Sequence, residues 1–244
     1  MRLTDQFRAP TLLFSGGKDS LAALLMLRAH WDDITVAWAN PGAPDPAALA
    51  YIERIAQRVP HFVELRGDQP GWIERNGWPA DIVPVRATQV LHGAEPAAVR
   101  FAPYTQCCDA NMWEPIRRYM ADSGCTLCIT GQRRAEKLRN RTRDEEFNEI
   151  DGIVFWNILN DWTDDQVFGF LRERAEPLPP GYERGARSSS DCWNCTAYLD
   201  HNAPRLQALR RDDPTRWEIV RPVLSELALR IEAETRPLFD LVGA

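Results

Sequence analysis

Four of the six cysteines form two pairs that lie far apart in the chain. Cys107 and Cys108 are adjacent, whereas Cys192 and Cys195 are separated by two residues. Thiolates are soft ligands that suit iron–sulfur clusters or zinc, so the two pairs could converge on one cluster. Zinc is one alternative, although structural zinc sites usually use two separated Cys-x-x-Cys pairs. The other alternative is that these cysteines are buried thiols that bind no metal.

The remaining cysteines, Cys125 and Cys128, also have two residues between them. They flank or enter the apolar run 127–130, so we expect both thiols to be buried in a strand. A redox or sulfur-carrying role is the alternative, and it would need exposure and a lowered thiol pKa.

A glycine-containing loop near the N-terminus has the composition of a phosphate-binding loop. Its residues are Ser15, Gly16, Gly17, Lys18, Asp19 and Ser20. Glycine lets backbone N–H groups approach phosphate oxygens, and the N-terminus of a following helix favours an anion. Lys18 would add a charge, Ser15 and Ser20 hydroxyl groups, and Asp19 a carboxylate that could help to hold Mg²⁺. The spacing differs from a Walker loop, and the alternative is a tight turn with a helix cap.

A basic segment follows the middle of the chain. Its members are Arg133, Arg134, Lys137, Arg139, Arg141 and Arg143. Guanidinium groups near a phosphate loop suit phosphate or sulfate binding. The alternative is a solvated helix face that is balanced by the acidic residues 144–146.

Alternating apolar runs and amphipathic stretches predict an α/β fold. The expected strands are 11–14, 35–39, 61–65, 127–130 and 153–156, and the expected helices are 21–30, 45–59, 112–120 and 163–171. This order implies an open, mostly parallel, twisted sheet with helices on both faces. Ligands bind such sheets at the carboxyl ends of the strands. We therefore expect one pocket near the phosphate loop, Asn40 to Gly42, and Gly131 to Arg134.

The C-terminal part of the sequence is expected to differ from the rest. Residues 176–190 are rich in Pro, Gly, Ser and Arg and predict a loop ahead of Cys192. Two helical stretches follow Pro204, with a break near Asp212 to Pro214. We expect a nucleotide-binding domain over residues 1–203, including the cysteine loop, and a helical tail over 204–244. The tail could pack on the core or on a second copy in a homodimer.

The composition limits the possible functions. The chain of 244 residues has 44% hydrophobic residues and a net charge of −6, which argues against a generally basic nucleic-acid-binding surface. It shows no secretory segment and no apolar run long enough to cross a membrane. We expect a cytoplasmic protein whose thiols stay reduced.

The motifs together resemble a known family. The loop from Ser15 resembles the pyrophosphate loop (PP-loop) of the adenine-nucleotide alpha-hydrolase superfamily. Within that superfamily, residues 11 to 200 are similar to the phosphoadenylyl-sulfate and adenylyl-sulfate reductases. The further motifs that carry the resemblance are Gly131-Gln132-Arg133-Arg134, Asp161-Trp162-Thr163 with Val167, Gly181-Tyr182, and Ser189 ahead of Cys192 and Cys195.

The resemblance implies a PP-loop, Rossmann-like fold and a set of site residues. Cys107, Cys108, Cys192 and Cys195 would bind a 4Fe–4S cluster. The nucleotide-binding residues would be Ser15, Gly16, Gly17, Lys18, Asp19, Ser20, Asn40, Gly42 and Gly131, with Lys18 and Asp19 in catalytic roles. Arg133, Arg134, Arg139 and Arg141 would bind substrate, and Mg²⁺ would accompany ATP or an adenylyl nucleotide.

The sequence departs from the family at three places. Lys137 stands where the family usually has Ser, and Ile158 where it often has Pro. The family's nucleophilic cysteine belongs to a C-terminal Glu-Cys-Gly-Leu-His motif, and this sequence has no cysteine after Cys195.

Because the sequence lacks the family's nucleophilic cysteine, we favour ATP-dependent adenylylation of an acceptor, followed by sulfur transfer. A nucleic acid or a thiol-bearing protein could be the acceptor. The alternative is adenylyl-sulfate or phosphoadenylyl-sulfate reduction to sulfite with an external thiol. A third possibility is a non-enzymatic nucleotide or redox sensor.

Overall fold

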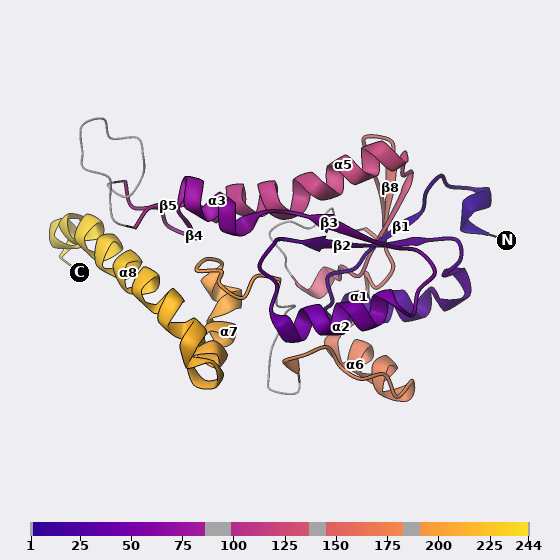
Figure 1. The fold of residues 1–244 in the computed structure, drawn as a ribbon. Coiled ribbons are helices and arrows are strands. Elements are labelled where there is room, and N and C mark those ends of the chain that lie inside the picture. The colour runs from indigo at the N-terminus through magenta and orange to yellow at the C-terminus, as the bar shows by residue number, and fades with distance from the viewer. Residues whose placement is uncertain (1, 86–98, 137–144, 183–190, 244) are drawn as a thin grey trace.

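The computed structural model describes residues 2–85, 99–136, 145–182 and 191–243, and its central element is a sheet of six strands (Figure 1). The spatial order of the strands is β3-β2-β1-β6-β8-β7. All neighbours are parallel except β7 and β8, which are antiparallel. The bounds are β1 Thr11–Leu13, β2 Thr35–Asn40, β3 Phe62–Arg66, β6 Leu127–Thr130, β7 Phe147–Ile150 and β8 Ile153–Asn157. The predicted α/β class and mostly parallel sheet are confirmed.

Helices cover both faces of this sheet, as predicted (Figure 1). One face packs against α1 (Lys18–Met26), α2 (Pro46–Ala56) and α6 (Asp164–Glu173) in the largest apolar cluster. The other face packs against α5 (Glu114–Ser123), with Ile116 and Met120 on Ala37 and Leu65. Because both faces are buried, the central strands can be continuous apolar runs rather than alternating ones.

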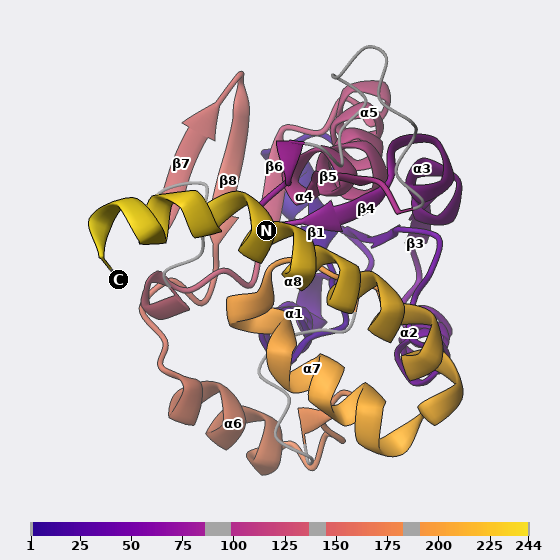
Figure 2. The ribbon, with the colours of Figure 1, turned by 90° about the vertical axis from the view of Figure 1, so that its left-hand side faces the viewer.

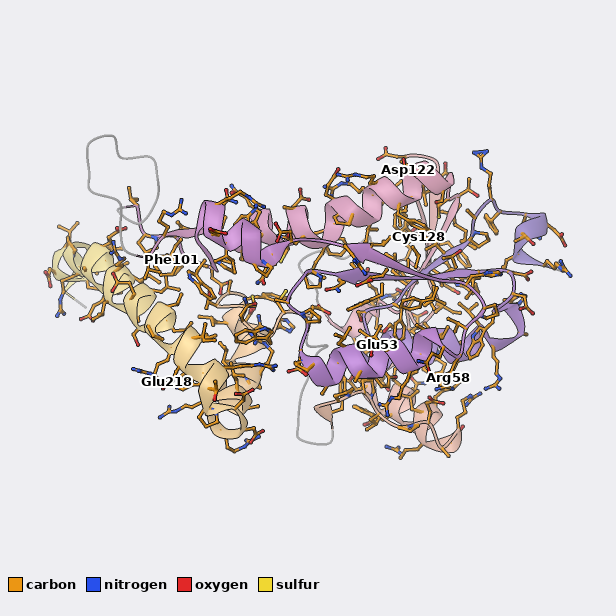
Figure 3. The ribbon with its side chains drawn as sticks, in the orientation of Figure 1. Glu53, Arg58, Phe101, Asp122, Cys128 and Glu218 are labelled. Carbon is orange, nitrogen blue, oxygen red and sulfur yellow. The ribbon has the colours of Figure 1, made fainter. Side chains whose placement is uncertain are left out.

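Cys125 and Cys128 belong to the core beneath α5 (Figure 3). Cys128 is completely buried and Cys125 is 4% exposed. Burial raises the pKa of both thiols, so neither has the exposure or the lowered pKa of a reactive cysteine. The predicted burial of this pair is confirmed.

A second, smaller group of elements lies beyond one end of the sheet (Figure 2). The strands β4 (Trp78–Ala80) and β5 (Phe101–Pro103) form a parallel pair. Phe101 of β5 packs on Val223 and Leu227 of the long helix α8, a separate small core (Figure 3). The helices near this end are α3 Gln69–Asn76, α4 Tyr104–Cys108, the π-helical turn η4 Asp109–Trp113, α7 Leu199–Asp212 and α8 Pro214–Val242.

Several elements differ from the sequence-based expectation. The helix expected from residue 112 begins as η4, and α5 follows at Glu114. The helix expected after Pro204 begins at Leu199 and contains that proline, although proline favours the first turn. None of the described helices combines the length and apolarity needed to span a bilayer.

Candidate functional site

The loop between β1 and α1 has the backbone that a phosphate site requires. Gly16 has a φ of +75°, which residues with a side chain adopt at a cost, and Gly17 is the N-cap of α1. The Ser20 hydroxyl donates to the Gly17 carbonyl at 2.9 Å, and the Ser15 hydroxyl lies 3.3 Å from that of Ser20. The backbone N–H of Lys18 faces the Tyr182 hydroxyl at 3.4 Å. The start of α1 therefore presents backbone donors beside hydroxyl groups.

Gly131 brings the end of β6 against the start of α1. A Cβ atom at this position would lie 2.7 Å from the backbone carbon and oxygen of Asp19, which is closer than real Cβ contacts. Only glycine permits this approach of the two backbones. The sequence-based placement of Gly131 beside the loop agrees with this contact.

Two buried cations and two carboxylates form an ion-pair network at the loop. The Lys18 ammonium lies 2.6 Å from Asp19 and 2.9 Å from Asp164. The Arg133 guanidinium lies 2.7 Å from Asp19 and 2.8 Å from Asp164. A hydrogen bond from Lys18, with further charge from Arg133, lowers the pKa of Asp164. Lys18 and Arg133 are thus held by carboxylates of the protein itself.

The other predicted basic residues have different positions. Arg134 is exposed and lies 3.1 Å from Asp161. Arg139 and Arg141 lie outside the described residues, as does Lys137. Of the two members of this group that the structure describes, Arg133 joins the network at the loop and Arg134 does not.

Asn40 and Gly42 lie at the end of β2, as expected. Their hydrogen bonds are with each other and with the neighbouring strand β3. The Asn40 side chain accepts a hydrogen bond from the Gly42 backbone at 2.9 Å and donates to Glu64 at 2.6 Å. Gly42 has a φ of +102°, which favours glycine. Both residues shape the turn that follows β2.

A cavity of about 260 Å³ adjoins the phosphate loop. Its floor comes from β1 and β2, and its walls come from segments far apart in the chain. The polar part of the lining consists of Ser15, Asp19, Ser20, Thr130, Gln132, Tyr182 and Asp191. Met112, Trp113 and Ile116 form an apolar wall. The cavity has a phosphate loop at one side and apolar side chains at another, as nucleotide sites commonly do.

The structure brings the two cysteine pairs into one region next to this cavity. Burial, followed by the charges of Cys108 and Cys195, raises the pKa of Cys107 to about 12. Burial and Cys195 likewise raise the pKa of Cys108 to about 12. The pKa of Cys192 is raised by burial first, and in part by Cys107 and Cys108. Each pair is therefore close enough to the other to affect its thiol pKa values. None of the four thiols forms a disulfide.

Side-chain amides donate to two of these sulfurs. The Asn111 amide lies 3.7 Å from the Cys107 sulfur, and the Asn202 amide lies 3.5 Å from the Cys195 sulfur. Arg205 fixes the backbone between Cys192 and Cys195, because its guanidinium donates to the carbonyl oxygens of Trp193 and, at 2.6 Å, of Cys195. Hydrogen-bond donors to ligand sulfurs, and to the backbone that carries the ligands, are features of iron–sulfur sites.

Within the described ranges, no three His, Cys, Asp or Glu side chains are placed to hold a single metal ion. What the structure places together is a set of four thiols with amide donors on two of them. The donor set matches the four-cysteine ligation of an iron–sulfur cluster in residue type and number.

Both cysteine segments also border the cavity. Met112 and Trp113 of the cavity wall belong to η4, the turn that follows Cys107 and Cys108. Asp191 of the polar lining directly precedes Cys192. The phosphate loop therefore lines this cavity, and the four-thiol region adjoins it through Met112, Trp113 and Asp191.

Sequence reasoning missed four residues of this arrangement: Asp164, Asn111, Asn202 and Arg205. Asp164 lies in the expected helix 163–171, but its ion pairs with Lys18 and Arg133 depend on tertiary contact. Asn111 and Asn202 belong to no motif of the sequence, and only the fold places them near sulfur.

Comparison with known proteins agrees with this fold. The chain belongs to the phosphoadenosine phosphosulfate reductase domain family, whose profile matches residues 9–198. A crystal structure of a phosphoadenylyl-sulfate reductase from Candida auris, in a phosphate complex, has a similar fold, with a TM-score of 0.55 at 16% identity. The match covers 77% of this chain and 83% of that one.

Two proteins of similar sequence are 30% and 25% identical to this chain. An adenosine 5'-phosphosulfate reductase of Burkholderia cepacia is 30% identical over 158 residues, which cover 64% of this chain and 57% of that protein. An uncharacterized protein of Methanocaldococcus jannaschii is 25% identical over 238 residues, 92% of this chain and 43% of that protein. The chain thus spans about half the length of these relatives.

Proposed function

We propose that this protein is an iron–sulfur enzyme that reduces a sulfonucleotide, adenylyl sulfate or its 3'-phosphorylated form, with an external thiol. The observation that supports this most directly is the shared cavity, in which the phosphate loop faces segments that carry both cysteine pairs. The relatives named as reductases also favour it over the adenylylation and sulfur transfer that the sequence alone suggested.

The nucleotide phosphate would bind at the start of α1. Backbone N–H groups of Gly17 and Lys18 and the hydroxyl groups of Ser15 and Ser20 would donate to it. The phosphate would replace their present contacts within the loop and with Tyr182. The positive end of α1 would stabilise the anion. Lys18 and Asp19 would keep the loop in shape through the ion-pair network, and Gly131 would keep α1 close to β6.

The remaining predicted contacts would serve the rest of the substrate. Arg133, through its network, would position the loop, whereas Arg134, Arg139 and Arg141 are the proposed contacts for sulfate or phosphate oxygens. Asn40 and Gly42 would shape the nucleotide pocket from the end of β2. Mg²⁺ as a companion of the nucleotide stays a prediction.

Cys107, Cys108, Cys192 and Cys195 would hold a 4Fe–4S cluster, which when bound would supply redox-active iron beside the nucleotide. Asn111, Asn202 and Arg205 would orient this ligand set. Because burial raises the thiol pKa values, loading would release protons from these cysteines.

The proposed reaction needs two thiols from outside the cavity. A thiolate attacks the sulfate sulfur, the S–O bond to the nucleotide phosphate breaks, and AMP, or adenosine 3',5'-bisphosphate from the 3'-phosphorylated substrate, leaves with the electron pair. A second thiol then attacks the sulfur of the S-sulfonated thiol, which gives a disulfide and sulfite. The sulfur gains two electrons, and two thiols lose them. Cys125 and Cys128 are too buried to take part, so an external dithiol fits best.

Sulfite and AMP release tests this proposal. Anaerobically purified protein would be mixed with either sulfonucleotide and with thioredoxin or glutathione. We expect sulfite and the matching nucleotide, AMP or adenosine 3',5'-bisphosphate, in equal amounts, a strong loss in Cys192→Ser, and little change in the matched core variant Cys128→Ser. A cluster-loaded protein that produces no sulfite from either nucleotide would contradict the proposal.

A second candidate, ATP-dependent adenylylation with sulfur transfer, keeps support from one observation. No cysteine of the described residues lines the cavity, so the structure shows no thiol placed to attack a sulfonucleotide there. In that reaction, an acceptor oxygen would attack the α-phosphorus of ATP, and Asp19 would help to hold Mg²⁺. Pyrophosphate release from MgATP with tRNA or DNA acceptors, without sulfite from sulfonucleotides, would favour this candidate.

A further inference from the structure

Gln69, at the start of α3, is a buried side chain whose polar atoms are unpaired. Its exposed fraction is 1%, and among the described residues neither its amide nitrogen nor its amide oxygen has a hydrogen-bond partner. Its backbone N–H is satisfied by the carbonyl of Pro41 at 2.8 Å. A buried carboxamide without partners costs folding free energy, so its retention at this position needs a physical reason.

One neighbour of Gln69 connects it to the first cysteine pair. The backbone N–H of Asp68 donates to the Asn111 side chain at 2.8 Å, and the Asn111 amide faces the Cys107 sulfur. Trp72, three residues after Gln69 and therefore on the same face of α3, packs with Cys107 in one apolar cluster. The face of α3 that carries Gln69 is thus the face toward Cys107.

The other side of Gln69 connects it to the second cysteine pair. A Cβ atom at Gly42 would lie 3.3 Å from the Gln69 backbone nitrogen, so the two segments are in contact. The next residue, Ala43, accepts a hydrogen bond from the backbone of Trp193 at 3.1 Å. Trp193 lies between Cys192 and Cys195. Gln69 is therefore bracketed by segments that contact both pairs.

We propose that the Gln69 amide donates a hydrogen bond to a sulfur of the cluster, and that Gln69 is a cofactor-binding residue. This inference rests on the proposed cluster, and it gives the unpaired amide its missing acceptor. Gln69 would join Asn111 and Asn202 as a third amide donor around the sulfurs. Donors to sulfur stabilise the more negative, reduced cluster and so raise its reduction potential.

The test compares Gln69→Met, which keeps the side-chain length without any donor, with Gln207→Met. Gln207 is an exposed residue of α7 and serves as the matched control. For each reconstituted protein we would measure iron and sulfide content, the midpoint potential by redox titration, and the rate of iron loss to a chelator. Thermal unfolding of the cluster-free proteins reports on the fold alone.

We expect the midpoint potential of Gln69→Met to be more negative than that of the wild type. Iron loss should be about 10-fold faster, in line with other residues that support metal ligands. The cluster-free variant should unfold at a temperature no lower than the wild type, because the unpaired amide has been removed. Gln207→Met should match the wild type in all three measurements.

Wild-type potential and iron retention in Gln69→Met would overturn this inference and leave the proposed cluster intact. A wild-type protein that takes up no iron and sulfide would overturn both. If Gln69→Met does not fold, Gln69→Leu replaces it, since its apolar side chain has neither a donor nor a titratable group. Gln69→Leu should also lower the potential, and an unchanged potential would count against the inference.

Discussion

Lys18 and Arg133 are buried cations that share the same two carboxylates. Their side chains are 5% and 3% exposed, and each contacts both Asp19 and Asp164. A buried ion pair contributes little net stability, but removal of one partner leaves an uncompensated charge. The network therefore makes the phosphate loop sensitive to the loss of a single carboxylate.

Asp19→Asn should lower the free energy of unfolding by about 3 kcal/mol, because Lys18 and Arg133 would retain only one carboxylate. Urea denaturation at neutral pH measures this change. The control is Asp122→Asn, an exposed position on α5, which should change stability by no more than about 0.5 kcal/mol (Figure 3). Equal effects of the two substitutions would show that the network does not stabilise the loop.

The lowered pKa of Asp164 predicts a dependence of stability on pH. The carboxyl has a lower pKa in the folded protein than its ordinary value of 3.8, because Lys18 and Arg133 favour its charged form. Its contribution is therefore present above pH 3.8 and is lost as the pH falls through the lower, folded value. Urea midpoints measured between neutral pH and about pH 2.5 should fall less steeply with acid in Asp164→Asn than in the wild type.

At the scale of elements, the contact between β6 and α1 depends on Gly131. Gly131→Ala should destabilise the protein by about 1–3 kcal/mol and weaken nucleotide binding, because the new methyl group would meet the Asp19 backbone. Gly169→Ala is the matched control within α6, where the nearest side-chain atom is 3.9 Å away. That change should stabilise the helix by up to about 1 kcal/mol. Denaturation and nucleotide titration measure both effects.

The sequence predicted the elements whose residues carry a clear local pattern. Apolar runs bounded by glycine located β1, β2, β3, β6 and β8, and Thr163 located the start of α6. The strand β7 was missed, although Asp151 and Gly152, both with positive φ, form the two-residue turn typical of a hairpin. The short strands β4 and β5 depend on packing with α8, and α3 and α4 pack together with Ala102 of β5, and local patterns report neither contact.

The sequence predicted the site less completely than the fold. The glycine loop was recognised because its residues are continuous, and each cysteine pair because its two members lie close together in the sequence. The roles of Asp164, Asn111 and Arg205 depend on partners more than ten residues away or on a helix turn that only the fold provides. Gln69 has no sequence motif at all, and only its burial draws attention to it.

At the scale of the whole molecule, the core of β4, β5 and α8 is separate from the two clusters that cover the sheet. Phe101→Ala should lower the free energy of unfolding of this small core by about 3–5 kcal/mol and increase hydrogen exchange in α8. Exchange in β1, β2 and β6 should change little. Phe239→Ala, at a 48% exposed position near the end of α8, is the control. Equal deprotection of the sheet by Phe101→Ala would show a single cooperative unit.

The helix α7 runs across the proposed boundary between residues 203 and 204. A recombinant fragment that stopped at residue 203 would retain Asn202 but lose Arg205, leaving the carbonyl oxygens of Trp193 and Cys195 without their guanidinium donor. Shortened versions intended for crystallisation or spectroscopy should therefore extend at least through Asp212, the last residue of that helix.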